Sequence, residues 1–209
     1  MTRISHSELA AAQRDFAAWW QVKQAPATGG RRLGYAQAVK LAIYKYHSLQ
    51  SNRAASLAHF DQLVAGRLTN QQRIAQARLQ LEAYIEWVEN SAVIVADHRV
   101  RLNLALDTDV VLGGEVSRVD LAPKGYRAVL LMERASSRWD QESRMPLIQL
   151  AIADRYQRSP EEVMVAVQRL DGTSLNEAAF DAHTRDAAFA AAAAIARQVQ
   201  RASRRARRT

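Results

Sequence analysis

The chain has 209 residues, of which 48% are apolar and 24% charged, a composition typical of a globular domain that can bury a core. It contains no cysteine, which excludes disulfides, thiolate zinc sites, iron–sulfur clusters and cysteine nucleophiles. Its five histidines lack close metal-ligand spacing, so we expect no metal and no cofactor. No apolar stretch has membrane-spanning length and the amino terminus lacks the apolar segment of a signal peptide, which predicts a cytoplasmic protein without a membrane partner.

The first part of the chain is predicted to be helical. Apolar residues recur at helical spacing over residues 7–24, 35–50 and 70–89, and a shorter helix is predicted over residues 53–65, ending at Gly66. Residues 24–30, which contain Pro26, Gly29 and Gly30, end the first of these helices. We therefore predict four helices within about residues 1–90.

The pattern then changes to that of strands. Residues 92–106 alternate with period two, residues 109–121 form a second strand interrupted by Gly113 and Gly114, and residues 126–132 are typical of a buried central strand. A helix over residues 146–157, a strand over 161–170 and a last helix over 175–203 complete the predicted order. This order predicts a mixed α/β (α+β) domain over residues 1–196, with a small central mixed sheet over about 91–196 flanked by helices.

The positive charge is concentrated at the carboxyl terminus. The net charge of +8 comes from 29 Lys and Arg against 21 Asp and Glu. The segment 197–209 contains no acid and six arginines: Arg197, Arg201, Arg204, Arg205, Arg207 and Arg208. We predict a separate arginine-rich tail that contacts phosphates without sequence preference, or an acidic protein surface. A solvated, frayed terminus is the simpler alternative.

Three motifs, in order, resemble one family. Residues 4–9 (Ile-Ser-His-Ser-Glu-Leu) precede an aromatic-rich helix, residues 113–120 and 125–134 are two glycine-initiated strands, and residues 146–152 (Pro-Leu-Ile-Gln-Leu-Ala-Ile) begin a helix. Together they resemble the RecB-like branch of the PD-(D/E)XK nuclease superfamily, which includes nuclease domains of recombination helicases and CRISPR-associated exonucleases. The resemblance extends over almost the whole chain and implies a restriction-endonuclease-like core.

The resemblance places the catalytic positions of this family on unsuitable residues. The metal-binding Asp falls on Ser117, the second acid on Met132, the lysine on Arg134 and the early histidine on Ala38; of the glutamine and tyrosine that follow, only Gln149 is retained. These enzymes cleave phosphodiesters with Mg²⁺, which requires carboxylate oxygens that serine and methionine do not supply. Arginine remains protonated and cannot take a proton from water.

Strand alternation predicts what replaces the metal. If Ser117 faces the former site, Glu115 and Val119 face it too, while Asp120 faces away. By the same rule Arg134 faces the site and Glu133 does not. We therefore predict an ion pair between Glu115 and Arg134.

The resemblance implies a catalytically inactive subunit that binds nucleic acid, a larger protein partner or both, within a DNA-processing or anti-phage defence complex. The candidate nucleic-acid contacts are the tail arginines together with Arg118, Arg134, Arg138 and Arg144, with Trp139 at the rim of the groove. One alternative is a purely structural adaptor without nucleic-acid binding. Another is an active Mg²⁺-dependent DNA nuclease with relocated acidic residues.

Overall fold

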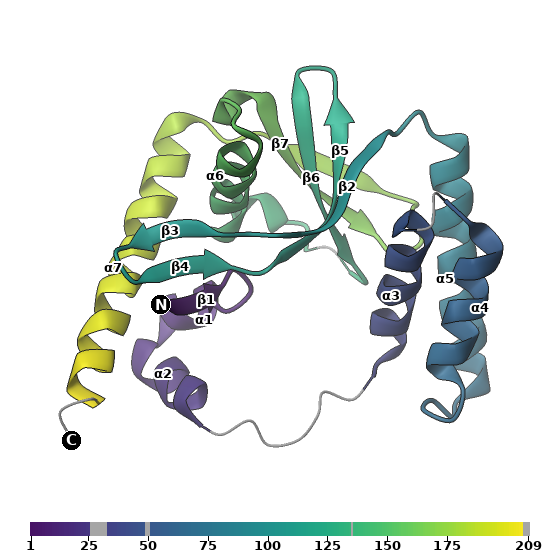
Figure 1. Ribbon diagram of the computed structural model, residues 1–209, viewed down its shortest axis with the longest axis horizontal. Helices are drawn as coiled ribbons and strands as arrows, with labels where there is room; N and C mark the ends of the chain where they lie inside the picture. Colours follow the sequence, from purple (N-terminus) through teal and green to yellow (C-terminus); the bar gives the residue numbers. More distant parts are fainter. Residues whose placement is uncertain (26–32, 49–50, 135, 207–209) are drawn as a thin grey trace.

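The computed structural model describes residues 1–25, 33–48, 51–134 and 136–206. These form a mixed α/β fold in which a five-stranded sheet and a three-stranded sheet are flanked by helices (Figure 1). The amino-terminal half is mainly helical, which confirms the predicted fold class. Within the described ranges, no helix combines the length and apolar character needed to cross a membrane.

The central sheet is mixed, with strand order β2-β5-β6-β7-β8. Its strands are β2 (Val95–Arg101), β5 (Glu115–Ala122), β6 (Gly125–Met132), β7 (Val163–Arg169) and β8 (Leu175–Ala178). The β6–β7 pair is parallel and the other neighbours are antiparallel. The side chains of β6 alternate between the two faces, because Ala128 and Leu130 belong to the core under helix α6 whereas Leu131 belongs to the core under helices α3–α5.

The second sheet has the order β1-β4-β3 and consists of β1 (Thr2–Ser5), β3 (Leu104–Asp107) and β4 (Val110–Gly113). Strand β1 runs parallel to β4 and was not predicted, since four residues with only Ile4 fully buried give too short a pattern. The chain passes from β4 to β5 through Gly114, whose φ is +121° and where an added Cβ would lie 2.2 Å from Cδ2 of His6. The predicted glycine interruption is therefore confirmed, and it is the point where the chain changes sheet.

The helices lie on both faces of the central sheet (Figure 1). They are α1 (Leu9–Arg14), α2 (Phe16–Gln24), α3 (Tyr35–Ser48), α4 (Arg53–Val64), α5 (Gln71–Asn90), α6 (Arg144–Tyr156) and α7 (Ala182–Ala206), with short 3₁₀ turns η1 (Trp139–Gln141) and η2 (Pro160–Glu162). Helices α3, α4 and α5 form one apolar layer, and α6 covers the opposite face of the sheet. Helix α7 packs along β3, β4 and α1.

Two predicted helix boundaries were wrong. The first helix breaks at Asp15, whose carboxylate accepts a hydrogen bond from Ala18 N–H at 3.0 Å and so starts α2. Residues 175–178 form the edge strand β8 rather than helix, because pairing with β7 overrides a weak local preference. Helix α7 continues through the arginine-rich segment to Ala206, and Val199 within that segment is fully buried in the core.

Candidate functional site

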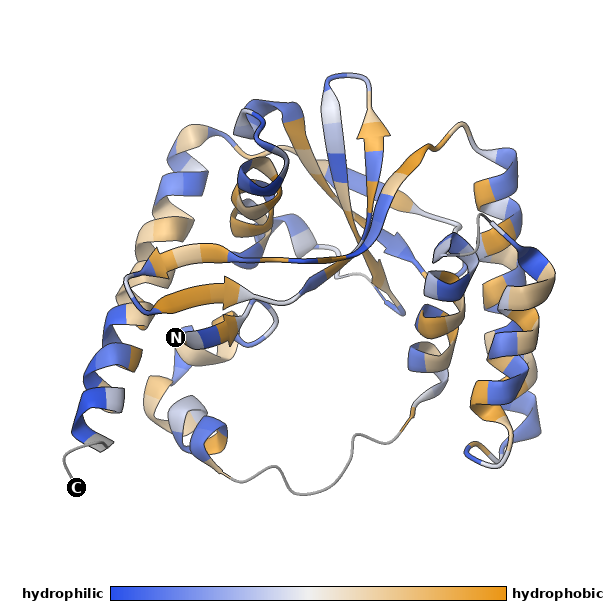
Figure 2. Cartoon of the chain, in the orientation of Figure 1, coloured by the Kyte–Doolittle hydropathy of each residue, from blue (hydrophilic) through white to orange (hydrophobic). Residues whose placement is uncertain are grey.

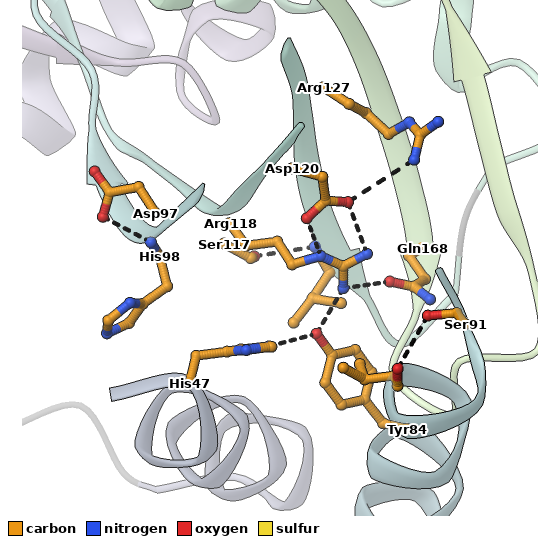
Figure 3. A network of polar contacts seen from close by, with 12 residues as sticks. His47, Tyr84, Ser91, Asp97, His98, Ser117, Arg118, Asp120, Arg127 and Gln168 are labelled. Atoms are coloured by element: carbon orange, nitrogen blue, oxygen red, sulfur yellow. Dashed lines mark hydrogen bonds and ion pairs between the residues drawn. The ribbon is translucent and has the colours of Figure 1, made fainter. Parts of the chain in front are cut away.

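A buried polar network lies between β5, β7, α3 and α5 (Figure 3). Arg118 is fully buried, and its guanidinium donates to both carboxylate oxygens of Asp120, at 2.7 and 3.1 Å. The Nη1 atom of Arg118 also donates to Tyr84 Oη at 2.5 Å and to Gln168 Oε1 at 2.6 Å. His47 Nε2 lies 2.9 Å from the same Tyr84 oxygen. The burial of a charged pair is thus compensated by two further hydrogen bonds to the guanidinium.

The proton positions in this network follow from its donors. Arginine can only donate, so the Tyr84 oxygen accepts from Arg118, and the same hydroxyl group lies within hydrogen-bonding distance of His47 Nε2. Burial raises the pKa of Tyr84 to about 12, which keeps the hydroxyl proton on the oxygen. Burial, followed by the charge of Arg118, lowers the pKa of His47 to about 3. His47 is therefore neutral at pH 7.

A second buried histidine lies where β1 meets β5. His6 is 7% exposed, and its Nε2 lies 3.4 Å from the carbonyl oxygen of Glu115. Burial, followed by the charge of Arg144, lowers the pKa of His6 to about 4. Both histidines must gain a proton when the protein unfolds in acid.

This burial predicts a loss of stability in mild acid. The folded-state pKa values of His47 and His6, about 3 and about 4, lie below the ordinary value of 6.5. Stability is therefore fully present above pH 6.5, and each histidine removes about 1.4 kcal/mol per pH unit as the pH falls towards its folded-state pKa. Urea unfolding at about pH 7 and about pH 5 measures this difference. His47→Gln should reduce it and the exposed His183→Gln should not; a flat profile in the unchanged protein would contradict the assignment.

The positions that resemble the nuclease metal ligands serve the fold. Ser117 is buried on β5, and its Oγ accepts a hydrogen bond from Leu131 N–H at 3.0 Å. Ala38 on α3 is buried against helices α4 and α5, and Met132 packs against the core under α6. Arg134 is exposed just after β6. Ala38 and Met132 therefore belong to cores on opposite faces of the central sheet.

Gln149, which the resemblance retains, holds two chain segments together. Its side chain is buried on α6, with Nε2 donating to the carbonyl oxygen of Pro160 at 2.7 Å. Its Oε1 accepts from Phe180 N–H at 2.8 Å. Both amide groups are therefore used between η2 and the segment that leads into α7.

The predicted ion pair between Glu115 and Arg134 was wrong. Glu115 instead pairs with Arg99 of the neighbouring strand β2, at 3.4 Å, and Arg99 also lies over the ring of Tyr44. The prediction from strand alternation fails here because β5 and β6 are paired only between the hairpin turn, at Ala122 and Gly125, and the pair Arg118–Val129. Glu115 and Arg134 therefore lie beyond the paired part of the two strands.

The donor set does not fit a magnesium ion. The carboxylate of Glu115 is already paired with a guanidinium, and the buried carboxylate of Asp120 is held by Arg118. In the part of the chain that the structure describes, no three His, Asp or Glu side chains come together in a way that could hold a metal ion. Magnesium requires several oxygen ligands without competing cations.

Three of the predicted nucleic-acid contacts were wrong or are already engaged. Arg118 is fully buried and cannot reach a phosphate. Trp139 is 7% exposed and belongs to the core under α6 rather than to a groove rim. Arg144 pairs with Glu142 at 2.6 Å and lies beside His6. Arg138 is exposed at the start of η1.

The carboxyl-terminal arginines form an exposed stripe on the last turns of α7. Their spacing of three and four residues places them on the side opposite to the buried Ile195, Ala196 and Val199. The described members of this arginine stripe are Arg197, Arg201, Arg204 and Arg205. Arg207 and Arg208 lie outside the described residues. Figure 2 shows these turns as a hydrophilic end of the helix, at the lower left of the molecule.

Two acids lie near the stripe: Asp107, and Asp109, which lines a pocket together with Arg204. The pKa of Asp107 on β3 is lowered, mainly by the backbone N–H of Thr108 and in smaller part by Arg197. The segment from Gln198 to Arg205 contains no acidic residue. The arginines beyond Arg197 therefore have no acidic neighbour along the helix.

No protein-family model matches the chain, and no curated protein is significantly similar to it in sequence.

Proposed function

We propose that this protein is a non-catalytic nucleic-acid-binding subunit with a RecB-like nuclease fold, and that the arginine stripe of α7 contacts the phosphate backbone. The observation that carries the proposal is the exposure of Arg197, Arg201, Arg204 and Arg205 on one face of a helix whose opposite face is anchored in the core. A rigid helix holds the guanidinium groups in a row, which suits a regular series of phosphates. The family resemblance supplies the setting, a DNA-processing or phage-defence complex.

The electrostatics of α7 favour this role. The carboxyl-terminal end of a helix has a partial negative charge, which stabilises cations such as Arg204 and Arg205 in the last turn. Such contacts recognise phosphates rather than bases, so binding should not depend on sequence. Release of counterions should make it weaken steeply with salt.

The proposal is tested by fluorescence polarisation with labelled duplex and single-stranded DNA and RNA over a series of salt concentrations. We expect binding without sequence preference and a linear fall of log K with log salt. Retention on an acidic protein without any nucleic-acid binding would favour the adaptor alternative. The absence of binding at low salt would refute the proposal.

The chain should not cleave nucleic acid with magnesium. Ser117 and Met132 supply no carboxylate, and Glu115 is paired with Arg99. We therefore expect no Mg²⁺- or Mn²⁺-dependent cleavage of linear, circular or single-stranded DNA, measured by gel electrophoresis with a PD-(D/E)XK nuclease as positive control. Cleavage that Glu115→Ala abolishes would overturn the non-catalytic assignment.

A further inference from the structure

A cavity of about 400 Å³ lies between α3, α5 and the carboxyl ends of β6 and β7. Its polar lining is contributed by Tyr35, Arg73, Gln76, Gln80, Glu133, Arg134 and Arg169. The volume falls within the range of small-molecule sites in proteins. The arginine stripe of α7 lies on the other side of the central sheet (Figure 1).

The cavity is rich in unneutralised positive charge. Three guanidinium groups line it against one carboxylate, that of Glu133. Arg169 pairs with Asp171 at 2.8 Å, but Arg73 and Arg134 form no ion pair with any described residue. Two arginines are therefore available to an incoming anion.

The arginines are held by separate parts of the fold. Arg169 ends β7, and the adjacent backbone N–H of Leu170 donates to the carbonyl of Met132 at 3.0 Å, which ties the end of β7 to that of β6 just before Arg134. On α5, the Arg73 guanidinium lies over the Tyr35 ring at 5.8 Å from its centroid. Carboxyl ends of strands are also the edge where α/β sheets commonly bind ligands. The three arginines thus come from different elements of the fold, whereas the charges of an ordinary solvated helix face all lie on one helix.

We propose that this cavity binds a phosphate monoester, supplied either by a free nucleotide or by the 5′ end of a nucleic-acid strand. A monoester carries up to two negative charges and three terminal oxygens, which match several guanidinium forks better than an internal diester does. Gln76, Gln80 and Tyr35 provide neutral hydrogen-bonding groups for the attached sugar or base. For a strand end, the proposal rests on the nucleic-acid binding proposed above; for a free nucleotide it does not.

The probes are adenosine monophosphate and one short DNA strand prepared with a 5′-phosphate or with a 5′-hydroxyl. Calorimetry and fluorescence polarisation measure the affinity of the full chain for each. A strand-end site predicts that the 5′-phosphate improves affinity about ten-fold or more over the 5′-hydroxyl strand. A free-nucleotide site predicts that adenosine monophosphate binds by itself and adenosine does not.

The variants are Arg134→Gln and Arg73→Gln, with Arg67→Gln as the control. All three arginines are exposed, and Arg67 does not line the cavity. Each cavity variant should reduce the preference for the phosphate group about ten-fold, because a charge-assisted hydrogen bond is lost. The control should retain the preference of the unchanged protein.

The results separate this proposal from the proposed function. A preference for the 5′-phosphate or for the monophosphate that Arg134→Gln removes supports the cavity, even if the stripe of α7 binds nothing. Equal affinity for the two strands, together with no binding of adenosine monophosphate, overturns the cavity proposal while nucleic-acid binding by α7 still stands. A preference that survives in both cavity variants overturns it as well.

Discussion

Replacing Asp120 with alanine is expected to lower the free energy of unfolding by about 3–5 kcal/mol, because it leaves the guanidinium of Arg118 buried without its counter-charge. The two side chains are 0% and 1% exposed, so water cannot replace the carboxylate. Arg127 lies 4.0 Å from Asp120, but in the Asp120→Ala variant it would keep its ion pair with Glu177. Arg118 has no other acidic partner among the described residues. Urea unfolding followed by tryptophan fluorescence measures the change.

Removing both charges should cost less than removing one. In Arg118→Met with Asp120→Leu no buried charge remains, and replacing a buried ion pair by apolar side chains is often nearly neutral. Tyr84 and Gln168 lose a partner in this variant, so we expect a residual loss of about 1–3 kcal/mol. A double variant that is less stable than Asp120→Ala alone would contradict this account of the network.

An exposed ion pair provides the matched control. Arg53 and Glu89 are separated by 3.2 Å, with side chains 45% and 41% exposed. Arg53→Met should change the free energy of unfolding by about 1 kcal/mol or less, since water and salt screen such pairs. If Asp120→Ala costs no more than this control, the network is not desolvated as described.

Replacing the four described arginines of the α7 stripe by glutamine is expected to abolish most of the nucleic-acid affinity. If each arginine neutralises one phosphate, the dependence of log K on log salt should lose about 0.9 per contact, or about 3.6 in total for a duplex. The affinity at about 200 mM salt should fall by about 100-fold. The substitutions are Arg197→Gln, Arg201→Gln, Arg204→Gln and Arg205→Gln. Glutamine and arginine have similar helix propensities, so α7 should remain folded.

A control variant lowers the net charge by the same four units but leaves the arginine stripe unchanged. It replaces four exposed arginines outside the stripe and the cavity by glutamine: Arg14, Arg67, Arg101 and Arg158. This control should retain most of the salt dependence, because its arginines lie on separate parts of the chain and do not share one helix face. An equal loss of affinity in both variants would show that only the net charge matters, and the interface on α7 would then be refuted. Circular dichroism verifies that both variants keep their helices.

The local pattern of the chain predicted much of the fold. Amphipathic spacing over residues 35–50 and 70–89 predicted helices that match α3 and α5, because a helical period can be recognised from nearby residues. The short helix predicted over residues 53–65 matches α4. The break at Gly113 and Gly114 was also predicted, since glycine there permits a conformation that other residues avoid. Short strands such as β1 and β8 were missed, because their identity depends on pairing with distant strands.

For the candidate sites, too, some properties could be predicted from the sequence and others only from the structure. That Ser117 and Met132 cannot replace carboxylates as magnesium ligands is a property of the side chains themselves, so it was readable without any structure. The position of Arg118 was not, because its partners Tyr84 and Gln168 lie 34 and 50 residues away and only packing brings them to it. The same is true of Arg73, Arg134 and Arg169, which meet at one cavity only because two strand ends and a helix converge there. Residue type decides which chemistry is possible, whereas burial and long-range contacts decide which charges face solvent.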